Sequence, residues 1–179
     1  MSTKYVELSD PIYEEVNRRI RKTYPSACIV FVESVHNDFL EAQFEDFKKQ
    51  LEEKRGPGLI NTMLLFHGTT ERASHNIIAE GFDPEYNTVS AYGKGTYFSA
   101  NAQTSSTYAK DARHNELQYM FLAEVIDGIR TTAAANQKID TDKYDLSVAT
   151  NVPLPNICCT PYRYGAIPRY LIGFHKYAI

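Results

Sequence analysis

Apolar residues near the start of the chain recur at helical spacing. The pattern predicts an amphipathic helix over residues 11–24, with Asp10 as N-cap, Pro11 in the first turn and Pro25 at its end. The residues expected on its buried face are spaced four apart: Ile12, Val16 and Ile20. This regular spacing indicates a helix that packs on a core through one side.

A second helix is predicted after a short β-rich run at 28–32. It begins at Asn37 or Asp38 as cap and ends before the Gly-Pro-Gly sequence at 56–58, which stops a helix. The side chains expected to face inward are Leu40, Phe44, Phe47 and Leu51. The first third of the chain therefore predicts two helices with one strand between them.

From Asn61 onward the pattern changes to short β-rich runs joined by polar turns. Strands are predicted at Thr62–Phe66, Thr96–Ser99, Leu117–Val125, Asn156–Thr160 and Tyr170–Phe174. The segment His67–Thr70 is expected to break the first of them. Short helices are predicted from Glu71 to Glu80, ended by Gly81, and from a cap at Ser99 or Asn101 to about Lys110. Thr131–Val152 is polar and is expected to be a long surface loop. Helices first and strands afterwards predict an α+β fold and not alternating βαβ units.

Length and composition place the chain among single globular domains. It has 179 residues, 43% of them apolar and 23% charged, so we expect one domain over 1–179. No apolar run approaches a bilayer's thickness and the N-terminus has no signal-like apolar segment, which predicts an intracellular protein with no membrane partner. Three cysteines, two of them adjacent, match neither a disulfide framework nor a metal site. The net charge of −3 disfavours a nucleic-acid partner but leaves it open.

Polar and aromatic residues gather where the predicted strands and helices end. Gly93-Lys94-Gly95 lacks the spacing of a phosphate-binding P-loop or of a dinucleotide-fold fingerprint, and alone it indicates a tight turn. His67 alone is also more typical of a structural histidine. Together with Tyr97 and Tyr108 these residues predict a pocket that can hold a flat heterocycle.

Two segments, Leu64–Thr69 and Ala91–Ser99, resemble the catalytic domain of the poly(ADP-ribose) polymerase superfamily. The chain is most similar to the mono-ADP-ribosyltransferase branch that includes the macrodomain-linked members, and the likeness covers nearly all of it. This resemblance implies two packed antiparallel sheets that form an NAD⁺ cleft, with N-terminal and flanking helices. NAD⁺ would serve as co-substrate, and no metal is implied.

The resemblance also implies roles for individual residues. His67 would bond a ribose hydroxyl, and the backbone of Gly68 would hold the nicotinamide carboxamide. The other implied NAD⁺-binding residues are Thr69 on the adenosine side, Ser105 beside the carboxamide, Tyr108 stacked on the nicotinamide ring, Tyr97 on its opposite face, and Tyr92 at the end of a lid over 82–92. For Tyr92 a solvent-facing loop position is the alternative.

The resemblance further implies that Ile157 stands at the third catalytic position of the family, where polymerizing members carry glutamate. The implied triad is His67, Tyr97 and Ile157, and an isoleucine cannot transfer a proton or bind a hydroxyl. Single-unit transfer is therefore expected, with a protein acceptor that is either another protein or the chain itself. Departures from the pattern at Thr104, at Arg169 and in the short segment 131–143 bear on the acceptor.

Two other functions remain open at this point. The chain could be an NAD⁺-site binding module with weak or no turnover, although the presence of both His67 and Tyr97 favours an enzyme. It could also modify nucleic-acid ends. The sequence leaves the oligomeric state open.

Overall fold

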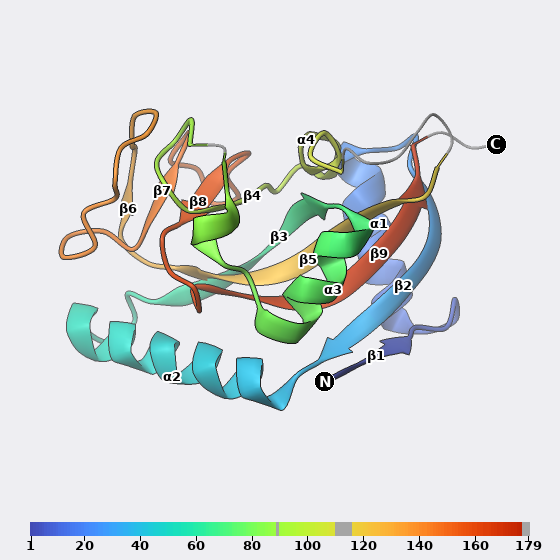
Figure 1. The fold of residues 1–179 in the computed structure, drawn as a ribbon, viewed down its shortest axis with the longest axis horizontal. Helices are drawn as coiled ribbons and strands as arrows, with labels where there is room; N and C mark the ends of the chain where they lie inside the picture. The colour runs from blue at the N-terminus through green and yellow to red at the C-terminus, as the bar shows by residue number, and fades with distance from the viewer. Residues whose placement is uncertain (89, 110–115, 177–179) are drawn as a thin grey trace.

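The computed structural model describes residues 1–88, 90–109 and 116–176, which form two sheets and their flanking helices (Figure 1). The helices are α1 Pro11–Thr23, α2 Asp38–Arg55, α3 Glu71–Glu80 and α4 Ala102–Ser106, with a 3₁₀ turn, η1, at Pro84–Tyr86. The strands are β1 Ser2–Tyr5, β2 Cys28–His36, β3 Asn61–Thr69, β4 Thr96–Phe98, β5 Gln118–Asp127, β6 Arg130–Thr131, β7 Leu146–Val148, β8 Cys158–Thr160 and β9 Ala166–His175. Within these residues, no helix is both long and apolar enough to cross a bilayer.

The strands form one large and one small sheet, which confirms the α+β class. The five-stranded sheet has the order β1-β2-β9-β5-β3 and is antiparallel throughout. The four-stranded sheet has the order β4-β8-β7-β6. Its β4–β8 and β7–β8 pairs are antiparallel and its short β6–β7 pair is parallel, so the expected sheets are confirmed as mostly antiparallel.

The large sheet is covered on both faces, which explains its mainly apolar strands. Figure 1 shows α1 behind this sheet and α3 in front of it. Val16 and Ile20 of α1 pack with Ile172 in one core cluster, while Ile78 of α3 packs with Phe121 in another that also includes the small sheet. Along β3 and β5, neighbouring buried residues belong to different clusters, because successive side chains of a strand point to opposite faces of the sheet.

Side-chain caps fix the helix starts that the sequence predicts. Asp10 accepts the N–H of Ile12 at 2.8 Å, and Asn37 rather than Asp38 caps α2. Gly56 takes φ 107° at the end of α2, a conformation that favours glycine. The expected inward faces are only partly confirmed, because Ile12 is exposed and Phe47 is half-buried.

Three sequence predictions are wrong in extent. His67–Thr69 does not break its strand, because each of these residues pairs with β5, from Phe121 to Tyr119. The expected surface loop 131–152 contains β7, which pairs with β8 and whose Leu146 and Val148 are buried in the core cluster between the two sheets. The helix expected to run to about Lys110 is the short α4, which ends at Ser106, and Lys110 itself lies outside the described residues.

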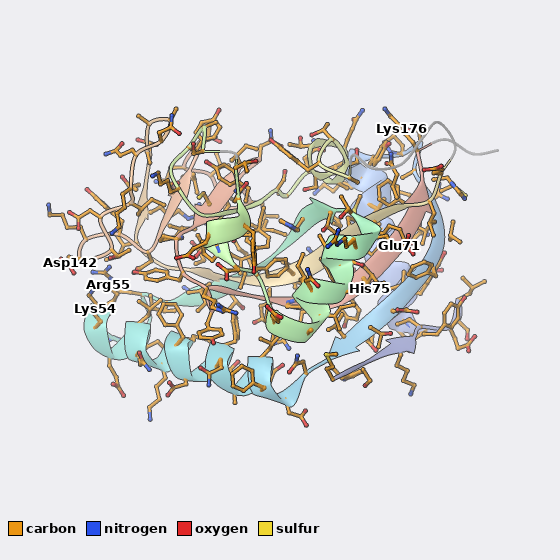
Figure 2. The ribbon with its side chains drawn as sticks, in the orientation of Figure 1. Lys54, Arg55, Glu71, His75, Asp142 and Lys176 are labelled. Atoms are coloured by element: carbon orange, nitrogen blue, oxygen red, sulfur yellow. The ribbon has the colours of Figure 1, made fainter. Side chains whose placement is uncertain are left out.

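A buried ion pair ties the end of α2 to the segment before β7. The Arg55 guanidinium bonds the Asp145 carboxylate at 2.9 Å and also donates to the backbone oxygens of Thr141 and Asp142. The carboxylate raises the pKa of Arg55. Figure 2 shows Arg55 next to Lys54 and Asp142 at the C-terminal end of α2.

We expect Arg55→Ala to lower the free energy of unfolding by about 3 kcal/mol, since it leaves the buried Asp145 carboxylate without its cation. Urea denaturation measures this loss. Lys54→Ala is the matched control, because the Lys54–Asp142 pair is 3.8 Å long and exposed, and its removal should change stability little. Equal effects of the two variants would contradict the assigned role of the buried pair.

Candidate active site

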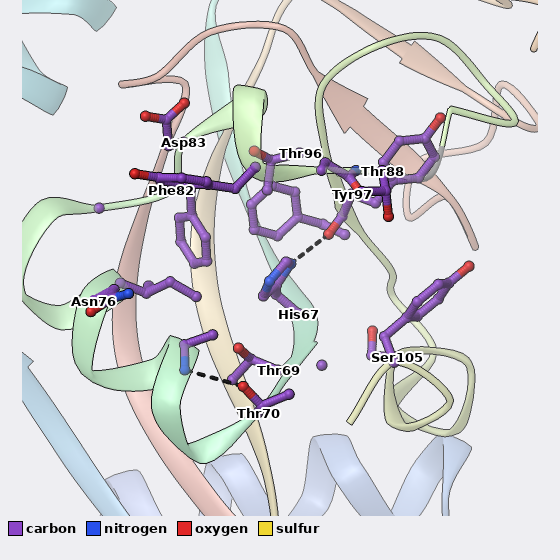
Figure 3. A pocket seen from close by; sticks show the side chains of 18 of the residues that line it. His67, Thr69, Thr70, Asn76, Phe82, Asp83, Thr88, Thr96, Tyr97 and Ser105 are labelled. Carbon is purple, nitrogen blue, oxygen red and sulfur yellow. Dashed lines mark hydrogen bonds between the residues drawn. The ribbon is translucent and has the colours of Figure 1, made fainter. Parts of the chain in front are cut away.

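A cavity of about 570 Å³ opens between the end of β3, helix α3, the loop after it, β4 and α4 (Figure 3). Seven of the eight residues proposed from the sequence line it: His67, Gly68, Thr69, Tyr97, Ser105, Tyr108 and Ile157. They come from four separate parts of the chain. Its size and its mixture of aromatic and polar walls are typical of a small-molecule site.

The two sheets are joined beside this cavity. Phe66 on β3 and Ser99 after β4 exchange two backbone hydrogen bonds, of 2.7 and 2.9 Å. This bridge holds the residue after Phe66, which is His67, directly against β4. The large sheet therefore supplies the histidine and the small sheet supplies Tyr97.

His67 is held as a neutral ring with a defined tautomer. Its Nδ1 lies 2.8 Å from the backbone oxygen of Tyr97, and because a carbonyl oxygen only accepts, Nδ1 carries the proton and donates. Burial lowers the pKa of His67. The ring also packs against Phe82 and Phe98, at centroid distances of 5.0 and 5.4 Å. Its Nε2 therefore remains free to accept a hydrogen bond. His67 lines the cavity, and Figure 3 shows its ring there.

Gly68 lies where α4 approaches the strand most closely. A Cβ atom at this position would lie 1.8 Å from the backbone oxygen of Ser105, so only glycine fits. Ser105 in turn donates its hydroxyl to the Phe66 carbonyl at 3.0 Å. This contact fixes α4, and with it Tyr108, over the edge of β3.

The backbone of Gly68 faces the open edge of β3. Phe66 uses its N–H and C=O on that edge to bond Ser99, and alternate residues of a strand present their backbone groups to the same side. Gly68, two residues on, therefore directs one N–H donor and one C=O acceptor toward the cavity. A donor and an acceptor side by side are complementary to a carboxamide.

Tyr97 contributes its ring to the wall while its hydroxyl is occupied elsewhere. The hydroxyl donates to the Gly93 oxygen at 2.6 Å and accepts the Tyr92 N–H at 2.8 Å. Burial raises the pKa of Tyr97 above its ordinary value. Tyr97 therefore fixes the turn before β4 and is unsuited to exchanging protons near neutral pH.

Tyr92 is the one proposed residue that does not line the cavity. Its side chain is 37% exposed, while its backbone N–H bonds Tyr97 and its backbone oxygen accepts a hydrogen bond from Ser147. The solvent-facing alternative describes this position better than direct contact with a ligand. Its backbone still supports the site through Tyr97.

The departures noted at Thr104 and Arg169 lie in different places. Thr104 lines the cavity and donates its hydroxyl to Asn156 at 3.2 Å. Arg169 is absent from the lining and pairs with Glu41 and Glu124. Only Thr104 is therefore placed to influence what approaches the site.

The sequence did not single out several residues of the wall. Phe82 and Phe98 enclose His67, and α3 adds Arg72 and Asn76. Phe82 follows the glycine that ends α3 and Phe98 follows Tyr97, so each lies beside a recognised signal. The position of α3 over the large sheet depends on tertiary packing, which no local signal specifies.

Comparisons with known proteins find similarity over most of the chain. The family described as the poly(ADP-ribose) polymerase catalytic domain matches residues 11–152. The human protein mono-ADP-ribosyltransferase PARP14 is 35% identical over 94% of this chain, and mouse PARP12, a protein of the same description, is 27% identical over 90%. Mouse PARP11, also described as a protein mono-ADP-ribosyltransferase, is 38% identical over 55% of the chain. The chain spans 10%, 24% and 30% of the lengths of PARP14, PARP12 and PARP11.

Proposed function

The chain belongs to the poly(ADP-ribose) polymerase catalytic-domain family, and from this premise we propose that it transfers single ADP-ribose units from NAD⁺ to a protein acceptor. The observation that carries the proposal is the convergence of a neutral histidine, an open strand edge and an aromatic side chain in one cavity. Each matches one part of NAD⁺: a ribose hydroxyl, the carboxamide and the pyridine ring.

The nicotinamide end of NAD⁺ would lie against β3 and α4. The N–H and C=O of Gly68 would pair with the carboxamide, and Tyr108, which is partly exposed after α4, would stack on the ring. Ser105 already donates its proton to Phe66, so its oxygen would accept from the carboxamide nitrogen. Tyr97 would close the opposite face.

The adenosine half would extend toward α3. Thr69 is buried at the end of β3 and lines the cavity, and Thr70 next to it caps α3 by accepting the Ala73 N–H (Figure 3). The Nε2 atom of His67 would accept a hydrogen bond from a ribose hydroxyl. The protein thereby holds both halves of the dinucleotide and exposes the bond between ribose and nicotinamide.

The reaction would break this glycosidic bond and form one to the acceptor. Positive charge develops on the ribose as nicotinamide leaves with the bonding electron pair, and hydrogen bonds to the ribose hydroxyls strengthen as this happens. Ile157 supplies neither a base nor a hydrogen-bond acceptor from its side chain. An acceptor that needs no deprotonation, such as a carboxylate, therefore suits this site, and one unit is transferred because the Ile157 side chain cannot activate a hydroxyl of the product.

The test uses purified protein with NAD⁺ labelled in the adenosine half. We expect nicotinamide release together with single ADP-ribose additions on the protein, read by intact-mass and peptide mass spectrometry. Long ADP-ribose chains would contradict single-unit transfer. Absence of both NAD⁺ binding and nicotinamide release would contradict the proposal as a whole.

A further inference from the structure

Asn156 lies immediately before Ile157, which lines the cavity. Its side chain is exposed, and its Oδ1 accepts hydrogen bonds from Ser99 at 3.3 Å and from Thr104 at 3.2 Å. Both of these residues line the cavity. These two hydrogen bonds attach the Asn156 amide to the cavity wall, next to Ile157 at the third position of the triad. They are called the tethers of Asn156 below.

The two tethers fix which way the amide faces. Ser99 accepts the backbone N–H of Asn101 at 2.9 Å and uses its own proton for Asn156, and Thr104 donates in the same way. Both donors converge on Oδ1, so the Nδ2 amino group is directed away from them. Within residues 1–88, 90–109 and 116–176, that amino group has no hydrogen-bond partner, and it retains two N–H donors.

The position of these donors distinguishes them from the groups that would hold NAD⁺. The groups that would bind NAD⁺ line the cavity itself. An attacking acceptor group must instead reach the ribose from the opening of the cavity. Ile157 is apolar and cannot orient that group. The exposed amide of Asn156, the adjacent residue in the chain, is a polar group placed to do so.

We propose that the Nδ2 group of Asn156 binds the acceptor carboxylate and orients it toward the ribose carbon that loses nicotinamide. This inference rests on the proposed function. One carboxylate oxygen forms the new bond to that carbon, the bond from the same carbon to the nicotinamide nitrogen breaks, and nicotinamide leaves uncharged with the electron pair. No proton is removed from the acceptor, so the step balances without a base.

Asn156→Asp is the isosteric test. The aspartate keeps an oxygen for Ser99 and Thr104 but replaces the amino group with a negative oxygen that repels a carboxylate. We expect transfer to protein carboxylates, read as label released by neutral hydroxylamine, to fall by about tenfold or more. We expect nicotinamide release with water as acceptor, and calorimetric NAD⁺ affinity, to stay within about twofold.

Asn156→Ala separates recognition from structural support. It removes the tethers and the donors without adding charge, so an acceptor-binding role predicts a smaller loss of transfer than in Asn156→Asp, whereas a purely structural role predicts a larger one. Asn151→Asp is the matched control, because it adds the same charge at an exposed position five residues earlier. It should leave transfer unchanged.

The outcomes distinguish this inference from the function on which it rests. If the wild-type protein releases no nicotinamide from NAD⁺, the proposed function fails and the role of Asn156 fails with it. If the wild type is active and Asn156→Asp modifies carboxylates at the wild-type rate, or Asn156→Ala loses more transfer than Asn156→Asp, only the role of Asn156 is overturned.

Discussion

Replacing Gly68 with alanine is expected to abolish NAD⁺ binding. The new Cβ would lie 1.8 Å from the Ser105 backbone oxygen and 3.4 Å from the Ala109 nitrogen, and backbone atoms cannot rotate away as a side chain can. Either α4 is pushed off β3 or the edge of the strand is displaced. Both changes separate the carboxamide-binding edge from Tyr108. Isothermal calorimetry should detect no NAD⁺ binding, a loss of at least about a hundredfold in affinity.

Gly58→Ala serves as the control for this prediction. Gly58 has φ +78°, and a Cβ atom added there would meet no atom within 4 Å, so its replacement strains the backbone without a collision. It should lower the melting temperature and leave NAD⁺ affinity unchanged. If Gly68→Ala bound NAD⁺ with wild-type affinity, the close approach of α4 to β3 would not be what builds the site.

Local signals predicted the helix starts well because each cap depends on neighbouring residues. The caps Asp10, Asn37 and Asn101 act within three residues of themselves. Strand extents were predicted less well, since pairing with a distant strand can override a local break. The His67–Thr69 segment contains a glycine yet continues its strand because β5, about fifty residues later, supplies the partner.

In the candidate site too, some features could be predicted from the sequence and others depend on contacts between distant residues. The resemblance implied which residues gather around NAD⁺, and seven of the eight line one cavity. The exception, Tyr92, shows why adjacency in sequence is insufficient: Tyr97 lines the cavity while the residue five positions earlier contributes only backbone bonds. The tethers of Asn156 span 52 and 57 residues, so no sequence pattern could indicate which way its amide faces.

His67→Asn is expected to reduce nicotinamide release and ADP-ribose transfer by about a thousandfold while the protein still folds. The asparagine amide nitrogen can replace Nδ1 as donor to the Tyr97 oxygen, but nothing replaces Nε2 as acceptor for the ribose hydroxyl. A hydrogen bond that strengthens in the transition state is lost, and a polar group of the bound substrate is left unpaired. Initial rates with saturating NAD⁺ measure the effect. A fall of less than about tenfold would contradict the role assigned to Nε2.

The pH dependence of stability tests the same histidine independently of substrate. Burial lowers the pKa of His67, so the folded protein keeps this ring neutral while the unfolded chain protonates it near the ordinary value of 6.5. Stability from this group is therefore fully present above about pH 6.5 and is lost as the pH falls below it. His67→Asn lacks this loss, so the stability gap between wild type and variant should narrow from about pH 7.5 to about pH 5.5 in urea titrations. A gap that stays constant would mean that His67 is protonated as readily in the folded protein as in the unfolded chain, which would contradict the lowered pKa that its burial predicts.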